Sequence, residues 1–102
     1  MLPLVAVLLA VGTAQALAPS SKTVNVGDAY FSAKKLTVSK GARVTWNWIG
    51  FLNHNVTVTN GPVKFHSKTQ VRGTFSHQFT RRGVYHLVCT IHPFMKMTIL
   101  VR

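Results

Sequence analysis

Hydrophobic and polar residues alternate along most of the chain from residue 22 onward. Apolar side chains recur at every second position in short runs, a pattern typical of β-strands with one buried face. The runs are marked by Val24 and Val26, Leu36 and Val38, Val44 to Trp48, Val56 and Val58, Phe75 to Phe79, Tyr85 to Cys89, and Met97 to Val101. Turn signals such as Lys40-Gly41 separate them, and no stretch has helical periodicity of useful length. The pattern predicts about six to eight short strands in an all-β antiparallel sandwich or barrel.

The beginning of the chain has a different pattern. Residues 2–18 carry no charged side chain, and the apolar run Leu4 to Val11 is followed by the small residues of Ala14-Gln15-Ala16. This is typical of a secretory signal peptide that is cleaved after Ala16, although no Lys or Arg precedes the apolar run. The alternative is an uncleaved N-terminal anchor. We therefore expect a signal over residues 1–16, one domain over residues 17–102, and a periplasmic or extracellular protein that is membrane-associated if cleavage does not occur.

The charge of the chain is strongly unbalanced. Twelve Lys and Arg residues accompany a single acid, Asp28, giving a net charge of +11. Such a field favours acidic proteins and other polyanions. The basic residues are scattered, without a dense tract or a nucleic-acid motif, so we do not expect nucleic-acid binding. A secreted polyanion-binding protein remains an alternative. A single carboxylate also excludes the usual acid and base pairs of hydrolases, so we do not expect an enzyme.

One segment near the C-terminus concentrates donors for a metal ion. Cys89-Thr90-Ile91-His92-Pro93-Phe94-Met95 places a thiol, an imidazole and a thioether close together. Cys89 is also the only cysteine, so the chain forms no internal disulfide. Soft and borderline donors of this kind suit copper rather than magnesium or calcium. We therefore expect a short loop that wraps one metal ion between Cys89 and Met95.

A trigonal copper site with a weak axial methionine needs a second histidine besides His92. His54 follows an irregular segment and stands at the start of a predicted strand, where a ligand can enter a site at the end of a sandwich. The position of His54 therefore makes it the candidate ligand. Surface or ordinary core positions are expected for the other three, which are His66, His77 and His86.

Short motifs recur along the chain between Val44 and Cys89. They are Val44-Thr45-Trp46, His54-Asn55-Val56, Phe65-x-Ser67, Thr74-Phe75-Ser76-His77-x-Phe79 and Gly83-x-Tyr85-x-Leu87-x-Cys89. With these motifs, residues 22–102 resemble the plastocyanin and amicyanin branch of the cupredoxins, and the Cys-x2-His-x2-Met spacing is similar to the short amicyanin ligand loop. The resemblance implies a Greek-key β-sandwich and one type 1 copper ion, with the ligands His54, Cys89, His92 and Met95.

A second methionine, Met97, could also be the axial ligand. Met97 fits the longer Cys-x2-His-x4-Met spacing of plastocyanins, but its parity with Ile99 and Val101 favours a place in the core. We therefore prefer Met95.

Residues beside the ligands are expected to orient them. Asn55 resembles the family position whose amide tethers the ligand loop near Thr90 and whose backbone N–H donates to the cysteine sulfur. Ile91 stands where amicyanin-like loops commonly carry proline, so its N–H could give the sulfur a second hydrogen bond. Asn53 likewise replaces a common proline, which predicts a less rigid approach to His54.

The resemblance further implies a one-electron carrier that cycles between Cu(II) and Cu(I). His92 is expected to be the exposed edge of the site, within an apolar docking patch formed by Phe51, Leu52, Pro93 and Phe94. The expected partners are redox proteins with acidic surfaces, and we expect a monomer without a small-molecule substrate. A copper-trafficking or storage protein, which would use similar donors, is the main alternative.

Overall fold

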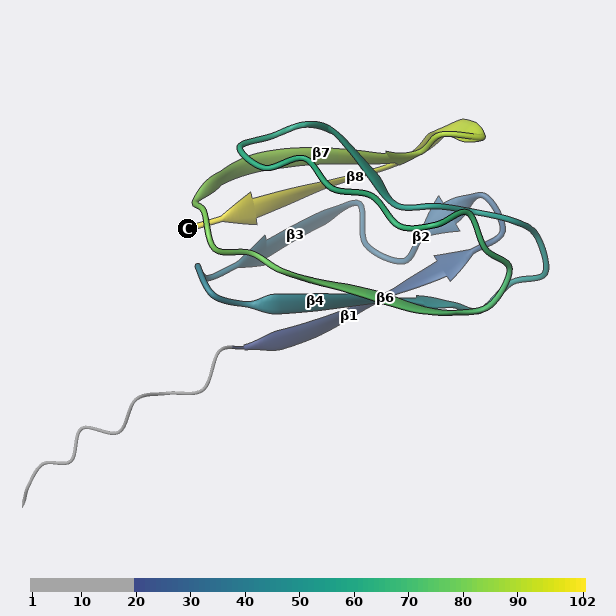
Figure 1. Ribbon diagram of the computed structural model, residues 1–102, viewed down its shortest axis with the longest axis horizontal. Coiled ribbons are helices and arrows are strands. Elements are labelled where there is room, and N and C mark those ends of the chain that lie inside the picture. The colour runs from purple at the N-terminus through teal and green to yellow at the C-terminus, as the bar shows by residue number, and fades with distance from the viewer. Residues whose placement is uncertain (1–19) are drawn as a thin grey trace, which may run out of the picture.

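Two four-stranded sheets face each other in the computed structural model, which describes residues 20–102 (Figure 1). The strands are β1 (Ser21–Gly27), β2 (Tyr30–Phe31), β3 (Lys35–Val38), β4 (Arg43–Trp48), β5 (Thr57–Asn60), β6 (Gly73–Gln78), β7 (Gly83–Cys89) and β8 (His92–Val101). One sheet has the order β2-β1-β4-β6 and the other β3-β8-β7-β5. The prediction of an all-β sandwich is confirmed. The predicted signal over residues 1–16 lies outside the described residues.

Each sheet is mixed rather than purely antiparallel. β1 pairs with β4 in parallel, and β3 pairs with β8 in parallel, whereas the remaining pairs are antiparallel. Two parallel neighbouring strands need a longer crossover connection. The alternation of residues along a single strand does not indicate the direction of its neighbours, so these parallel pairs were not predicted. Within residues 20–102 there is no helix long and apolar enough to span a membrane.

The core lies between the sheets and consists of the alternating apolar side chains seen in the sequence. Trp46 of β4 is fully buried at its centre. Its ring lies among three phenylalanine rings, with centroid distances of 5.9 to 6.5 Å to Phe65, Phe75 and Phe79. Aromatic side chains bury much area, so this cluster supplies a large part of the hydrophobic stabilisation.

Two elements differ from the pattern read in the sequence. The short strand β2 was not predicted, because two residues are too few to show alternation. β8 begins at His92, five residues before the predicted Met97. Its ladder with β7 is interrupted, since Val88 pairs with Lys96 whereas the next residue, Cys89, pairs with His92. Residues 93–95 therefore bulge from the ladder at the end of the sandwich.

Candidate metal centre

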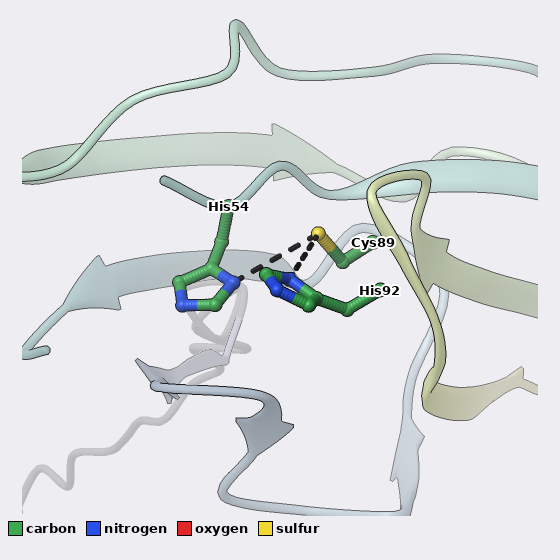
Figure 2. A group of neighbouring side chains, drawn as sticks. All are labelled: His54, Cys89 and His92. Carbon is green, nitrogen blue, oxygen red and sulfur yellow. Dashed lines mark hydrogen bonds between the residues drawn. The ribbon is translucent and has the colours of Figure 1, made fainter. Parts of the chain in front are cut away.

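Three side chains from two distant parts of the chain converge at this end of the sandwich (Figure 2). One ligand atom each from His54, Cys89 and His92 lies within 4.8 Å of the others. The Cys89 sulfur is 3.9 Å from Nδ1 of His54 and 3.8 Å from Nδ1 of His92. In both rings Nδ1 is thus the nitrogen nearer the sulfur.

These separations fit a single metal ion. For bonds near 2.0 Å to nitrogen and 2.3 Å to sulfur at tetrahedral to trigonal angles, the two donors lie about 3.5 to 3.7 Å apart, slightly closer than the separations found here. His54 and Cys89 are fully buried, whereas His92 is partly exposed. The site therefore offers two imidazoles and one free thiol in an enclosed setting, the donor set that suits copper or zinc.

Strand ends place the three side chains. Cys89 is the last residue of β7, and a two-residue turn returns the chain to His92 at the start of β8. His54 lies between β4 and β5, where its backbone N–H and carbonyl exchange 3.0 Å hydrogen bonds with Gln70. The indole N–H of Trp48 also donates to the His54 carbonyl, at 3.1 Å. Backbone contacts on both sides therefore fix the position of His54.

Asn55 links the segment around His54 to the turn after Cys89. Its backbone N–H lies 3.4 Å from the Cys89 sulfur. Its side-chain amide donates to the hydroxyls of Thr90 and Thr69, at 2.8 and 3.0 Å, and its side-chain carbonyl accepts from the Thr90 N–H at 3.1 Å and from the Thr57 hydroxyl at 2.8 Å. Asn55 is nearly fully buried, so these contacts satisfy its polar atoms and tie the segment around His54 to the turn between Cys89 and His92.

Ile91 and the two methionines have distinct surroundings. Ile91 is half exposed, and within residues 20–102 no hydrogen bond joins its N–H to the Cys89 sulfur, so the geometry does not support the predicted second bond. Met95 and Met97 are both buried in β8. The Met97 sulfur lies 3.5 Å from the indole nitrogen of Trp46 and accepts its N–H in the core.

Asp28 is a contact of the site that the sequence did not reveal. Its carboxylate lies 3.1 Å from Nε2 of His54 and accepts hydrogen bonds from the backbone N–H groups of Phe51 and Leu52. These contacts hold the pKa of Asp28 below its usual value of 3.8, chiefly through the His54 bond and then through the two backbone bonds. In the sequence, Asp28 could be noticed only as the single acidic residue, at a predicted turn of a very basic chain. That position does not indicate which residue the carboxylate contacts.

The remaining residues singled out from the sequence lie outside the cluster. His66 and His86 are exposed, and His77 stacks on Phe65 with a centroid distance of 3.7 Å. All four residues expected to form the docking patch are exposed, with fractions of 86% for Phe51, 52% for Leu52 and 70% for Phe94, and with Pro93 exposed beside it. Within the described part of the chain, the three converging side chains are therefore distinct from the other histidines, and His92 lies beside the exposed Phe94 ring, at a centroid distance of 6.0 Å.

Known proteins show the same fold and a related sequence. Amicyanin-alpha of Methylorubrum extorquens is 34% identical over 100 residues, which cover 91% of this chain and 84% of the relative. The reduced Cu(I) form of an amicyanin variant at pH 4 superposes with a TM-score of 0.73 at 27% identity, covering 84% of this chain and 86% of that chain. A copper-containing nitrite reductase from Thermus scotoductus gives a TM-score of 0.75 at 30% identity, covering 92% of this chain but 25% of the larger one.

The sequence profile of the copper binding proteins of the plastocyanin/azurin family matches residues 18–102. This match covers the whole sandwich, including His54, Cys89 and His92. The chain therefore belongs to the plastocyanin/azurin family of copper-binding proteins.

Proposed function

We propose that this protein is an exported type 1 copper protein that carries one electron at a time between redox partners. The observation that carries the proposal is the convergence of His54, Cys89 and His92 within 4.8 Å, in a chain of the plastocyanin/azurin family. Bound copper would supply the redox chemistry by alternating between Cu(II) and Cu(I). The residues of the chain hold the donors in place, limit access of water and present one edge of the site to partners.

Met95 completes the proposed ligand set as the weak axial donor. Met97 is two residues further along β8, where its sulfur accepts the indole N–H of Trp46 in the core. That contact gives Met97 a structural role and leaves Met95, which lies in the bulge beside His92, as the thioether nearest to the site in sequence. This supports the short ligand spacing over the longer one.

Stiffness of the site is what electron transfer requires of this chain, because rearrangement between the two oxidation states slows the transfer. Asn55 ties the His54 segment to the turn at Thr90 through its buried amide. Pro93 restricts the backbone directly after His92. We therefore assign Asn55 and Thr90 to the tethering of the ligands, with Ile91 as the exposed side chain of the turn.

His92 is the proposed route for electrons. It is the ligand with an exposed edge, whereas His54 and Cys89 are fully buried. Phe51, Leu52, Pro93 and Phe94 form the proposed docking patch on the same loops as the ligands. A small apolar surface of this kind suits the brief encounters of redox proteins.

The setting of the protein follows from its sequence and charge. The apolar segment supports a signal over residues 1–16 and a single domain over residues 17–102, and therefore a periplasmic or extracellular location. The net charge of +11 supports acidic partner surfaces. We propose a monomer that acts as a carrier rather than as an enzyme. The similarity to one part of a nitrite reductase is compatible with this, because that match covers 25% of the larger chain.

Visible absorption during copper loading tests the proposal. Purified protein should take up one equivalent of Cu(II) and develop the strong thiolate-to-copper band of a blue site, and Cys89→Ser should abolish that band. Ser76→Ala is a suitable control, because Ser76 is exposed on β6 and its hydroxyl contacts only the Thr45 hydroxyl among the described residues. A colourless Cu(II) form of the wild type would contradict the proposal. Rapid loss of copper to a chelator would instead favour a trafficking or storage protein.

A further inference from the structure

Asp28 is the only carboxylate side chain in the sequence, and it makes several contacts with the loop that carries His54. It lies in the turn between β1 and β2 and is about one-third exposed. Both of its oxygens lie 3.1 Å from the Phe51 nitrogen, and Oδ1 also lies 3.0 Å from the Leu52 nitrogen and 3.1 Å from Nε2 of His54. One carboxylate thus joins the β1–β2 turn to three residues of a different connection.

The His54 ring has its two nitrogens directed at different partners. An ionised carboxylate only accepts hydrogen bonds, so Nε2 carries the proton in its contact with Asp28. In the neutral ring, which is the form that binds a metal ion, Nδ1 then has the free lone pair, and it lies 3.9 Å from the Cys89 sulfur. Because the ring is fully buried, no water competes for either nitrogen.

Gly50 leaves the room that this arrangement needs. A Cβ atom placed at residue 50 would overlap the Asp28 carboxylate, with Oδ1 as its nearest neighbour. The carboxylate therefore occupies the volume that any other side chain at this position would take. Two features far apart in the sequence, an acid at residue 28 and a glycine at residue 50, together form one built contact.

From this geometry we infer that Asp28 is a positioning residue for His54, which holds the ring in the tautomer and orientation that present Nδ1 to the copper. The inference rests on the proposed copper function and deepens it. Asn53 leaves the backbone before His54 free of the restriction that a proline would impose. The hydrogen bonds from Phe51 and Leu52 to Asp28 restrict the same loop instead. A hydrogen-bonded carboxylate makes an imidazole ligand more basic, which favours Cu(II) over Cu(I).

The first test uses the metal-free protein and two substitutions that act by different routes. Asp28→Leu keeps much of the volume but has no acceptor oxygen, so the hydrogen bond with Nε2 of His54 is lost. Gly50→Ala keeps the charge but displaces the carboxylate. In the pH range in which the His54 ring is neutral, nitrogen NMR should show the proton on Nε2 in the wild type, and a mixture of the two tautomers in both variants.

The second test measures copper. Loss of a group that orients a metal ligand typically weakens metal binding by about 10- to 100-fold. We expect Cu(II) affinity to fall by this factor in Asp28→Leu and Gly50→Ala, and the reduction potential to rise. Ser32→Ala is the matched control, because the Ser32 hydroxyl accepts the Asn25 N–H at 2.8 Å beside the same β1–β2 turn without contacting His54. This control should retain wild-type affinity, potential and His54 tautomer.

The outcomes separate this inference from the proposed function. A wild type that does not turn blue with copper removes the proposed function, and the NMR result then still reports whether Asp28 sets the tautomer of His54. A blue wild type whose His54 tautomer, affinity and potential are unchanged in both variants overturns the inference. Equal losses in the Ser32→Ala control would also overturn it, because they would reflect general damage to the β1–β2 connection.

Discussion

Met95 and Met97 are two residues apart in the same strand, but we expect substitution of Met95 to change the copper site and substitution of Met97 to change the stability of the fold. Leucine has nearly the volume of methionine, so packing is largely retained. Met95→Leu should keep the stability of the metal-free protein but raise the reduction potential and alter the visible spectrum, because the axial ligand tunes both. Met97→Leu should keep the spectrum but lower the free energy of unfolding by about 1 to 3 kcal/mol, because the buried Trp46 N–H loses its acceptor.

Spectra of the copper forms and urea unfolding of the metal-free forms check both changes. The two variants serve as controls for each other, since they make the same chemical change in one strand. If Met97→Leu changed the spectrum and Met95→Leu did not, Met97 would be the axial ligand.

Single residues differ in how far the sequence alone could assign them. Cys89 and His92 could be predicted because they are close in sequence, and a short loop must keep them close in space. His54 needed position and resemblance together. Asp28 could not be assigned, because its contacts with Phe51 and His54 cross between two connections that only the packed sheets bring together.

At the scale of elements, Tyr85 anchors the passage from β6 to β7, where the chain crosses between sheets. Its ring is fully buried, and its hydroxyl donates to the Arg81 carbonyl at 2.8 Å. Tyr85→Phe keeps the ring but removes this bond, and we expect a loss of about 0.5 to 1.5 kcal/mol in the free energy of unfolding. Chemical denaturation measures the loss. The exposed Tyr30 provides the control. A similar loss in Tyr30→Phe would contradict a specific role for the hydrogen bond between Tyr85 and Arg81.

The strands themselves followed from alternation, and their departures from it have physical causes. Val24, Trp46 and Leu87 are buried as their parity predicts, because each faces the other sheet. The early start of β8 could not be predicted, since Cys89 pairs with His92 across a tight turn while residues 93–95 leave the ladder. The tight turn keeps His92 close to Cys89, and the bulge at residues 93–95 lets the regular pairing of β7 with β8 resume at Lys96.

β6 carries a pH-sensitive contribution to stability. The pKa of His77 lies below its ordinary value of 6.5, first because burial penalises the charged ring and second because Arg43 repels it. A group whose pKa is lower in the folded state contributes stability that is fully present above the unfolded value and is lost as the pH falls through the folded value. The metal-free protein should therefore become less stable as the pH drops below 6.5.

Replacement of the ring isolates this effect from the other histidines. His77→Phe preserves an aromatic ring against Phe65 but does not titrate, so its free energy of unfolding should fall less over the same pH range. His86→Gln, at an exposed site, should behave like the wild type. Urea unfolding at several pH values compares the three proteins, and an equal fall in His77→Phe would exclude His77 as the cause.

The whole molecule combines an apolar patch at the copper end with a positive field. The net charge is +11, and the only acidic side chain, Asp28, is engaged with N–H groups of the chain itself. Lys34 and Lys96 line a surface hollow with Phe94, so positive charge lies directly beside the proposed docking patch. Long-range attraction and local contact therefore favour the same face for an acidic partner.

Electron-transfer kinetics at varied ionic strength test this picture. Steering accelerates association by about 10- to 1,000-fold at low salt, so the rate with an acidic redox protein should fall by about tenfold or more as salt is added. The rate with an uncharged small-molecule reductant should stay nearly constant. Lys96→Glu should slow the reaction with the acidic partner more than Lys40→Glu, because both replace a positive charge with a negative one but only Lys96 lies beside Phe94. A rate that does not depend on salt would remove steering altogether. Equal effects of the two lysines would instead assign the attraction to the net charge rather than to the face around the copper.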